Sequence, residues 1–101
     1  YKFREEMKLV TEQPKVRIIR MRTVPAIDST GLQTLTEVYE NCKKNGIAFI
    51  ISDIHTQPLV TIQRSGFLEE IGEENVPGDI DESLNRAREI LGLPKVEGQI
   101  Q

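Results

Sequence analysis

The spacing of hydrophobic positions changes several times along the 101 residues, and these changes predict helices that alternate with strands. Phe3, Met7 and Val10 recur at helical spacing among charged residues, which predicts an amphipathic helix over residues 1–10, cut off at its own start. Residues 16–21 are mostly β-branched with arginines between them, which predicts a strand. This part of the sequence therefore indicates a helix followed by a strand.

A second amphipathic pattern predicts a helix over residues 32–42, which stops at the Asn45-Gly46 pair. We expect Leu35 and Val38 to be buried and Cys42 to be a small core residue. As the only cysteine, Cys42 also excludes an internal disulfide. The apolar positions that share one face of this helix are Leu32, Leu35, Val38, Tyr39 and Cys42.

Residues 47–51, Ile-Ala-Phe-Ile-Ile, are apolar without alternation. A strand covered by helices on both faces has this pattern, and such strands are typical of parallel sheets. Because a helix of crossover length separates this strand from the one at 16–21, we expect the two strands to be adjacent and parallel.

Two short elements are predicted next. A helix is expected to begin near Pro58 and to end at Ser65-Gly66. The brief apolar patch formed by Phe67, Leu68 and Ile71 is interpreted as a short strand.

The last helix is predicted to begin at Asp79 or Asp81 and to stop at Gly92. Residues 95–101 show no periodicity and are expected to form a flexible tail, which leaves residues 1–94 as one domain. The order of elements predicts an α/β sandwich with a mainly parallel sheet. The residues of the last helix that we expect to face the core are Ile80, Leu84, Ala87 and Leu91.

The charge and composition exclude several classes of partner and setting. Thirteen basic and sixteen acidic residues give a net charge of -3, which argues against nucleic acid as the main partner. The longest apolar run, residues 47–51, is far shorter than the ~20 residues that span a bilayer, and no signal-peptide pattern opens the sequence. We therefore expect a soluble piece in cytosolic surroundings.

No residue pattern points to catalysis. His55 is the only side chain that would act as a base near neutral pH without a shifted pKa, and one histidine with one cysteine cannot form a typical zinc site. The glutamates of residues 69–74 lack the alternation of a calcium loop, and no glycine-rich phosphate-binding motif occurs. We expect no enzyme activity, no cofactor and no metal.

The tetrapeptide Asp28-Ser29-Thr30-Gly31 lies between an apolar stretch and the helical pattern that begins at Leu32. At such a strand–loop–helix junction, the first backbone N–H groups of the helix are unpaired and carry partial positive charge, so an anion is stabilised there. Ser29 is therefore a candidate phosphoacceptor. The structural alternative is that Asp28 or Ser29 is simply the N-cap and Gly31 permits close packing, and a cap residue can also be modified.

Residues 16–31, which end in Arg-Met-Arg-Thr-Val-Pro-Ala-Ile-Asp-Ser-Thr-Gly, resemble the strand-and-loop signature of STAS domains (sulfate transporter and anti-sigma-factor antagonist). Gln57-Pro58-Leu59, Arg64-Ser65-Gly66-Phe67, the stretch 71–76 and Asp79-Ile80-Asp81 look like the version at the cytoplasmic C-terminus of SulP anion permeases. Soluble antagonists share the Asp-Ser-[Ser/Thr]-Gly box but usually lack the Gly-Glu-Glu-Asn segment.

The resemblance implies a non-catalytic regulatory domain on the cytoplasmic side of an inner- or plasma-membrane anion transporter. Its partners would be the transmembrane domain of the same protein, cytosolic regulatory proteins or a serine kinase, with a homodimer as one arrangement. One alternative is a freestanding anti-sigma-factor antagonist switched by phosphorylation of Ser29. A further one is a nucleotide or anion sensor that uses residues 28–31.

The sequence departs from the family pattern in one respect. STAS domains begin with two strands before their first helix, whereas this sequence starts inside what resembles that helix. The strand at 16–21 is then expected to present an edge that upstream residues or another chain would complete.

Overall fold

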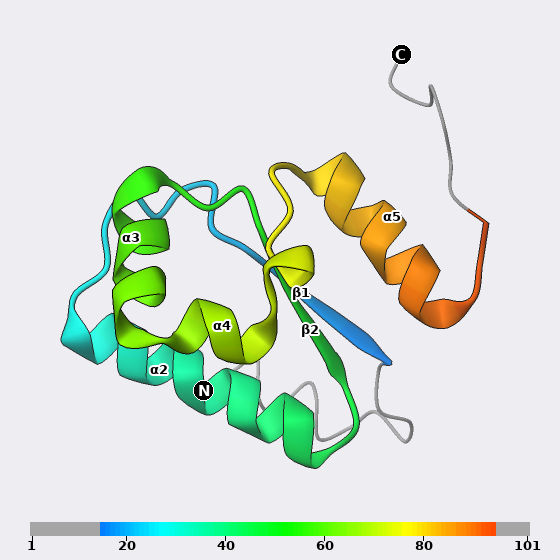
Figure 1. Cartoon of the computed structure of the whole chain (residues 1–101), viewed down its shortest axis with the longest axis horizontal. Coiled ribbons are helices and arrows are strands. Elements are labelled where there is room, and N and C mark those ends of the chain that lie inside the picture. Colours follow the sequence, from blue (N-terminus) through cyan, green and yellow to red (C-terminus); the bar gives the residue numbers. More distant parts are fainter. Residues whose placement is uncertain (1–14, 95–101) are drawn as a thin grey trace.

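A computed structural model describes residues 15–94 of the chain (Figure 1). The predicted helix over residues 1–10 and the tail at 95–101 lie outside the described residues. The elements in chain order are β1 (Val16–Arg20), α2 (Ser29–Lys44), β2 (Ala48–Ser52), α3 (Thr56–Ser65), α4 (Phe67–Ile71), the 3₁₀ turn η1 (Glu73–Asn75) and α5 (Ile80–Leu91).

β1 and β2 are adjacent and parallel, with Ile18 opposite Ile50 and Ile19 opposite Ile51, as the sequence predicts. α2 connects the two strands. Ile50 and Ile51 point to opposite faces of the sheet, yet neither is accessible to solvent. β2 is therefore covered on both sides, which explains its apolar run without alternation, whereas β1 is half-buried over most of its length.

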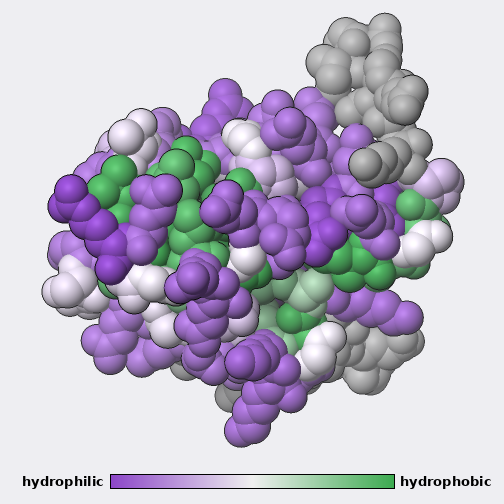
Figure 2. All heavy atoms as spheres, in the orientation of Figure 1, coloured by the Kyte–Doolittle hydropathy of each residue, from purple (hydrophilic) through white to green (hydrophobic). Residues whose placement is uncertain are grey.

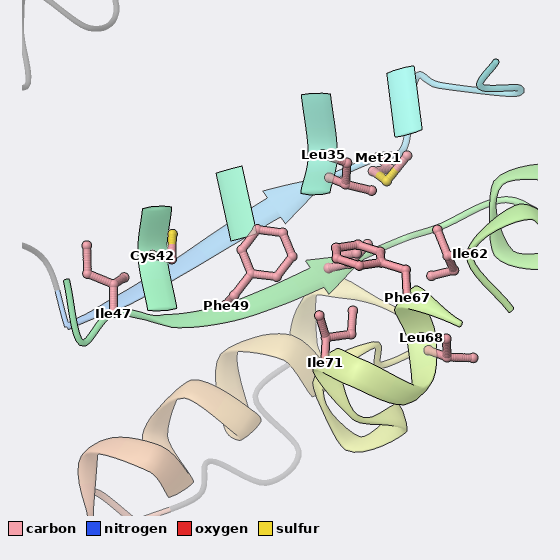
Figure 3. Packing of buried hydrophobic residues seen from close by; sticks show 10 residues of the cluster. Met21, Leu35, Cys42, Ile47, Phe49, Ile62, Phe67, Leu68 and Ile71 are labelled. Atoms are coloured by element: carbon pink, nitrogen blue, oxygen red, sulfur yellow. The ribbon is translucent and has the colours of Figure 1, made fainter. Parts of the chain in front are cut away.

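The main core lies between the sheet and helices α2, α3 and α4 (Figure 3). Three aromatic rings meet there edge to face: the centroids of Tyr39 and Phe49 are 5.5 Å apart, and those of Tyr39 and Phe67 are 5.4 Å apart. The buried residues of this cluster are Met21, Leu35, Cys42, Ile47, Phe49, Ile51, Ile62, Phe67, Leu68 and Ile71.

The burial predicted for α2 is confirmed for Leu35 and Cys42 but is wrong for Val38. Val38 is half-buried and packs against the edge of the cluster. The apolar stripe of α2 is broad, so its central positions contact the sheet while the flanking positions keep part of their surface in water.

Residues 67–71 form helix α4, not the predicted short strand. Gly66 ends α3 with a φ of 85° and redirects the chain, and its carbonyl accepts a hydrogen bond from the N–H of Glu70. Phe67, Leu68 and Ile71 are all buried, because Ile71 lies three and four positions after the other two and residues at these spacings share one side of a helical turn.

The predicted limits of α5 are confirmed, since Asp79 is the N-cap and Gly92 the C-cap, but its predicted buried face is only partly correct. Ala87 is buried with Ser83, whereas Leu84 and Leu91 are 40% and 42% exposed. Because Ser83 and Ala87 are small, α5 packs closely on β2 along these two residues. Leu84 and Leu91 then lie at the border of this contact, where part of each side chain stays in water. In Figure 2, hydrophobic residues are visible between α5 and β1.

Among residues 15–94, the sheet consists of β1 and β2. No helix in this range is long and apolar enough to cross a bilayer.

Candidate functional site at the first turn of α2

Asp28 is the N-cap of α2, which confirms one of the two capping predictions. Its Oδ1 accepts a hydrogen bond of 2.8 Å from the N–H of Gly31, and its carbonyl accepts one of 2.9 Å from the N–H of Leu32. The backbone of Asp28 is extended, as is usual for a cap. Ser29 is then the first residue of the helix.

The side chains of Asp28, Ser29 and Thr30 are exposed, and Gly31 is half-buried. Because Asp28 satisfies the N–H of Gly31, the N–H groups of Ser29 and Thr30 are the ones at this end that lack a partner within the helix. The Ser29 hydroxyl therefore lies at an accessible, partly positive helix end, beside one carboxylate. A phosphoryl group at this hydroxyl would meet attraction from the helix end and repulsion from Asp28.

The loop between β1 and α2 is held by side chains from the start of α3. Oε1 of Gln57 accepts from the N–H of Ile27 at 2.9 Å, and Nε2 of Gln57 donates to the carbonyl of Ile27 at 3.2 Å. Nε2 of His55 lies 2.6 Å from the carbonyl oxygen of Arg22. The sequence alone did not predict that Gln57 and His55 belong to the site, because no local pattern signals contacts between residues 30 or more positions apart.

The ends of the two strands are also joined. Nε of Arg20 donates to Oδ2 of Asp53 at 3.3 Å, and the same oxygen accepts from the Ser52 hydroxyl at 2.7 Å. The backbone N–H of Met21 donates to the carbonyl of Ser52 at 2.9 Å. The carboxyl ends of the two strands thus lie together, and the loop that leads from β1 to α2 is tied to the start of α3 (Figure 1).

A shallow groove runs along the outer face of α2 and begins at Ser29. Its charges are mixed, with Glu37 and Glu40 followed by Lys44. The other described residues that line it are Leu32, Gln33, Thr36 and Asn41.

The described residues hold no cluster of three or more histidine, cysteine, aspartate or glutamate side chains that could bind a metal ion. Burial raises the pKa of the Cys42 thiol, and the positive charge of Arg17 opposes this shift in part. A buried thiol with a raised pKa is a poor nucleophile. The features that distinguish this region are therefore the exposed Ser29 hydroxyl and the hydrogen bonds that hold Asp28 and the preceding loop.

The model of the STAS domain family matches residues 1–87. The chain belongs to this family. Two solved structures are similar over 90% of the chain: a sulfate transporter family protein from Wolinella succinogenes (36% identity, TM-score 0.80) and the STAS domain of a SulP transporter from Vibrio cholerae (30% identity, TM-score 0.79). The chain covers 75% and 71% of those two chains.

The chain is also similar to a probable sulfate transporter 4.2 of Arabidopsis thaliana, with 39% identity over 57 residues. That match spans 56% of this chain and 8% of the plant protein. The parallel sheet with helices packed on it agrees with the STAS fold, as the match to the Vibrio cholerae STAS domain indicates.

Proposed function

We propose that this STAS domain is a non-catalytic regulatory module of a SulP-type transporter for sulfate or another inorganic anion, on the cytoplasmic side of the membrane. The similarity to STAS domains of sulfate transporter proteins over 90% of the chain supports this role. The partner is the transmembrane domain of the same protein, and the domain acts through surface contacts.

The observation that carries the regulatory part of the proposal is the exposed Ser29 at the start of α2. A serine kinase has access to its hydroxyl, and a phosphate there adds close to two negative charges. The helix end stabilises those charges, so the fold survives, while Asp28 next to it repels the phosphate. Phosphorylation therefore changes the surface that the transmembrane domain or a cytosolic protein contacts.

Anion uptake by the full-length protein tests this proposal. Ser29→Asp and Ser29→Ala should express equally and differ in uptake, and phosphoserine should be found at position 29 in cells. Thr23 is a matched control, because its hydroxyl is also exposed in the β1–α2 loop but lies away from the helix end. Thr23→Asp and Thr23→Ala should transport equally.

Equal uptake by both Ser29 variants, together with the absence of phosphoserine at this position, would overturn the phosphorylation part. Ser29 would then have only a structural role, as the first residue of a helix that Asp28 caps. Absence of anion transport by the full-length protein, in cells and in vesicles with a panel of inorganic anions, would overturn the transporter assignment.

A further inference from the structure

The amide group of Gln57 satisfies both backbone polar groups of Ile27. Oε1 accepts from the Ile27 N–H at 2.9 Å and Nε2 donates to the Ile27 carbonyl at 3.2 Å. Ile27 directly precedes Asp28, the cap of α2, and Gln57 is the second residue of α3. One side chain therefore attaches the residue before the α2 cap to the first turn of α3, and Figure 1 shows the segment that leads into α2 running beside α3.

His55 fixes the other end of the same loop. It is the residue before α3, and its ring makes no capping hydrogen bond to that helix. Its Nε2 instead lies 2.6 Å from the carbonyl oxygen of Arg22. A carbonyl oxygen only accepts, so Nε2 carries the hydrogen. Two side chains from the start of α3 thus hold the beginning and the end of the loop over residues 22–27.

A loop that is anchored at both ends has little freedom to absorb a change at its end. A negative charge on Ser29 repels the neighbouring Asp28 carboxylate, which lies 2.8 Å from the Gly31 nitrogen and must stay within hydrogen-bond distance of it to cap the helix. Any displacement of Asp28 moves Ile27, because the two residues share a peptide bond. Through its two hydrogen bonds to Ile27, Gln57 then passes the displacement to α3.

We propose that Gln57 is a positioning residue that couples the first turn of α2, with Ser29, to the first turn of α3. This inference rests on the proposed function of Ser29 as a switch. It extends that function, because a protein that contacts the phosphorylated domain meets an altered α3 as well as an altered α2.

Hydrogen exchange measured by mass spectrometry on the full-length protein tests the coupling. Gln57→Met keeps the length of the side chain and removes both hydrogen bonds, so exchange in residues 22–28 should become about fivefold faster, as expected for the loss of about one net hydrogen bond. Gln63 is the matched control, since it is exposed in the last turn of the same helix. Gln63→Met should leave exchange in residues 22–28 unchanged.

The decisive measurement is a double-mutant comparison. Ser29→Asp should change exchange in residues 59–65 of α3 by at least about twofold, the lower range for coupled sites, and this change should disappear when Gln57→Met is also present. In the Gln63→Met background the change should persist. A purely structural Gln57 would slow or speed exchange without altering the response to Ser29→Asp.

The coupling is overturned if Ser29→Asp has the same effect on residues 59–65 with and without Gln57, or no effect in either background. This failure is distinct from failure of the switch. A Ser29 that is never phosphorylated in cells would remove the proposed regulation but leave the exchange coupling intact. Phosphorylation that alters transport without any response in α3 would remove only the role of Gln57.

Discussion

Arg20 at the end of β1 and Asp53 just after β2 form an ion pair across the carboxyl ends of the two parallel strands, with Nε of Arg20 3.3 Å from Oδ2 of Asp53. Asp53 makes this contact from a left-handed backbone conformation with a φ of 58°. The Ser52 hydroxyl donates to the same carboxylate oxygen at 2.7 Å. The polar contacts of Asp53 therefore hold a turn that is unfavourable for a residue with a Cβ atom.

The backbone at Asp53 yields a direct prediction. Asp53→Gly and Asp53→Ala both remove the carboxylate, but only alanine must keep a Cβ in the left-handed region. We expect the glycine variant to be more stable than the alanine variant by about 1 kcal/mol in urea unfolding. An alanine variant as stable as the glycine variant would show that the turn relaxes to another conformation.

Burial within the core cluster predicts the cost of truncating a leucine. Leu35 is 9% exposed, and Leu35→Ala should lower the free energy of unfolding by about 2–5 kcal/mol. Leu84 undergoes the same substitution on α5 but is 40% exposed, so Leu84→Ala should cost less than about 1 kcal/mol. Chemical denaturation of both variants measures the difference. Equal costs would mean that Leu84 is covered in the folded protein.

Local patterns predicted β1, β2, the caps and most helix limits. Asp28 and Asp79 cap their helices by hydrogen bonds to the N–H group three residues later, which depends only on nearby sequence. The unalternating strand at residues 47–51 likewise indicated the two covered faces of β2.

Features that depend on tertiary packing were not predictable in the same way. Gln57 contacts Ile27 from thirty positions away, and no periodicity encodes that pair. The stripe of α5 is amphipathic, but the small size of Ser83 and Ala87 decides which side packs on the sheet, and this leaves Leu84 and Leu91 partly exposed. Residues 67–71 are too few for the pattern to distinguish a strand from a helical turn.

The pKa of Cys42 predicts a stability that depends on pH. Burial raises this pKa above its ordinary value of 9.0 in the folded state, so the folded protein binds the thiol proton more tightly than the unfolded chain does. The stabilisation that comes from the tighter binding of this proton is present below about pH 9. It is lost as the pH rises from about 9 toward the folded-state pKa of Cys42.

Cys42→Ala is the comparison that isolates this effect, because it keeps the helix and removes the titrating group. The stability advantage of the native protein over this variant should be constant between about pH 7 and 8 and should shrink above about pH 9. Urea unfolding across this range measures it. An advantage that stays constant to about pH 10.5 would contradict the predicted loss.

A substitution of Gly31 tests whether folding or partner binding requires a glycine at this position. The sequence suggested that this glycine permits close packing, but a Cβ at position 31 would lie 3.4 Å from Cβ of Ile27 and 3.5 Å from Oδ1 of Asp28, which are ordinary contacts. Because alanine favours the helix, Gly31→Ala should be neutral or stabilise the domain by up to about 1 kcal/mol.

Gly46 is the matched control for Gly31→Ala. It has a φ of +71° with open space around it, so Gly46→Ala is strained by its backbone alone and should cost about 1 kcal/mol. Thermal and urea unfolding of the two variants compare them directly. A loss of more than about 1 kcal/mol in Gly31→Ala would show that the fold needs the glycine. The Gly31→Ala protein could instead be stable while its anion uptake no longer responds to Ser29→Asp. That result would show that a partner that contacts this helix end, and not the fold, requires the glycine.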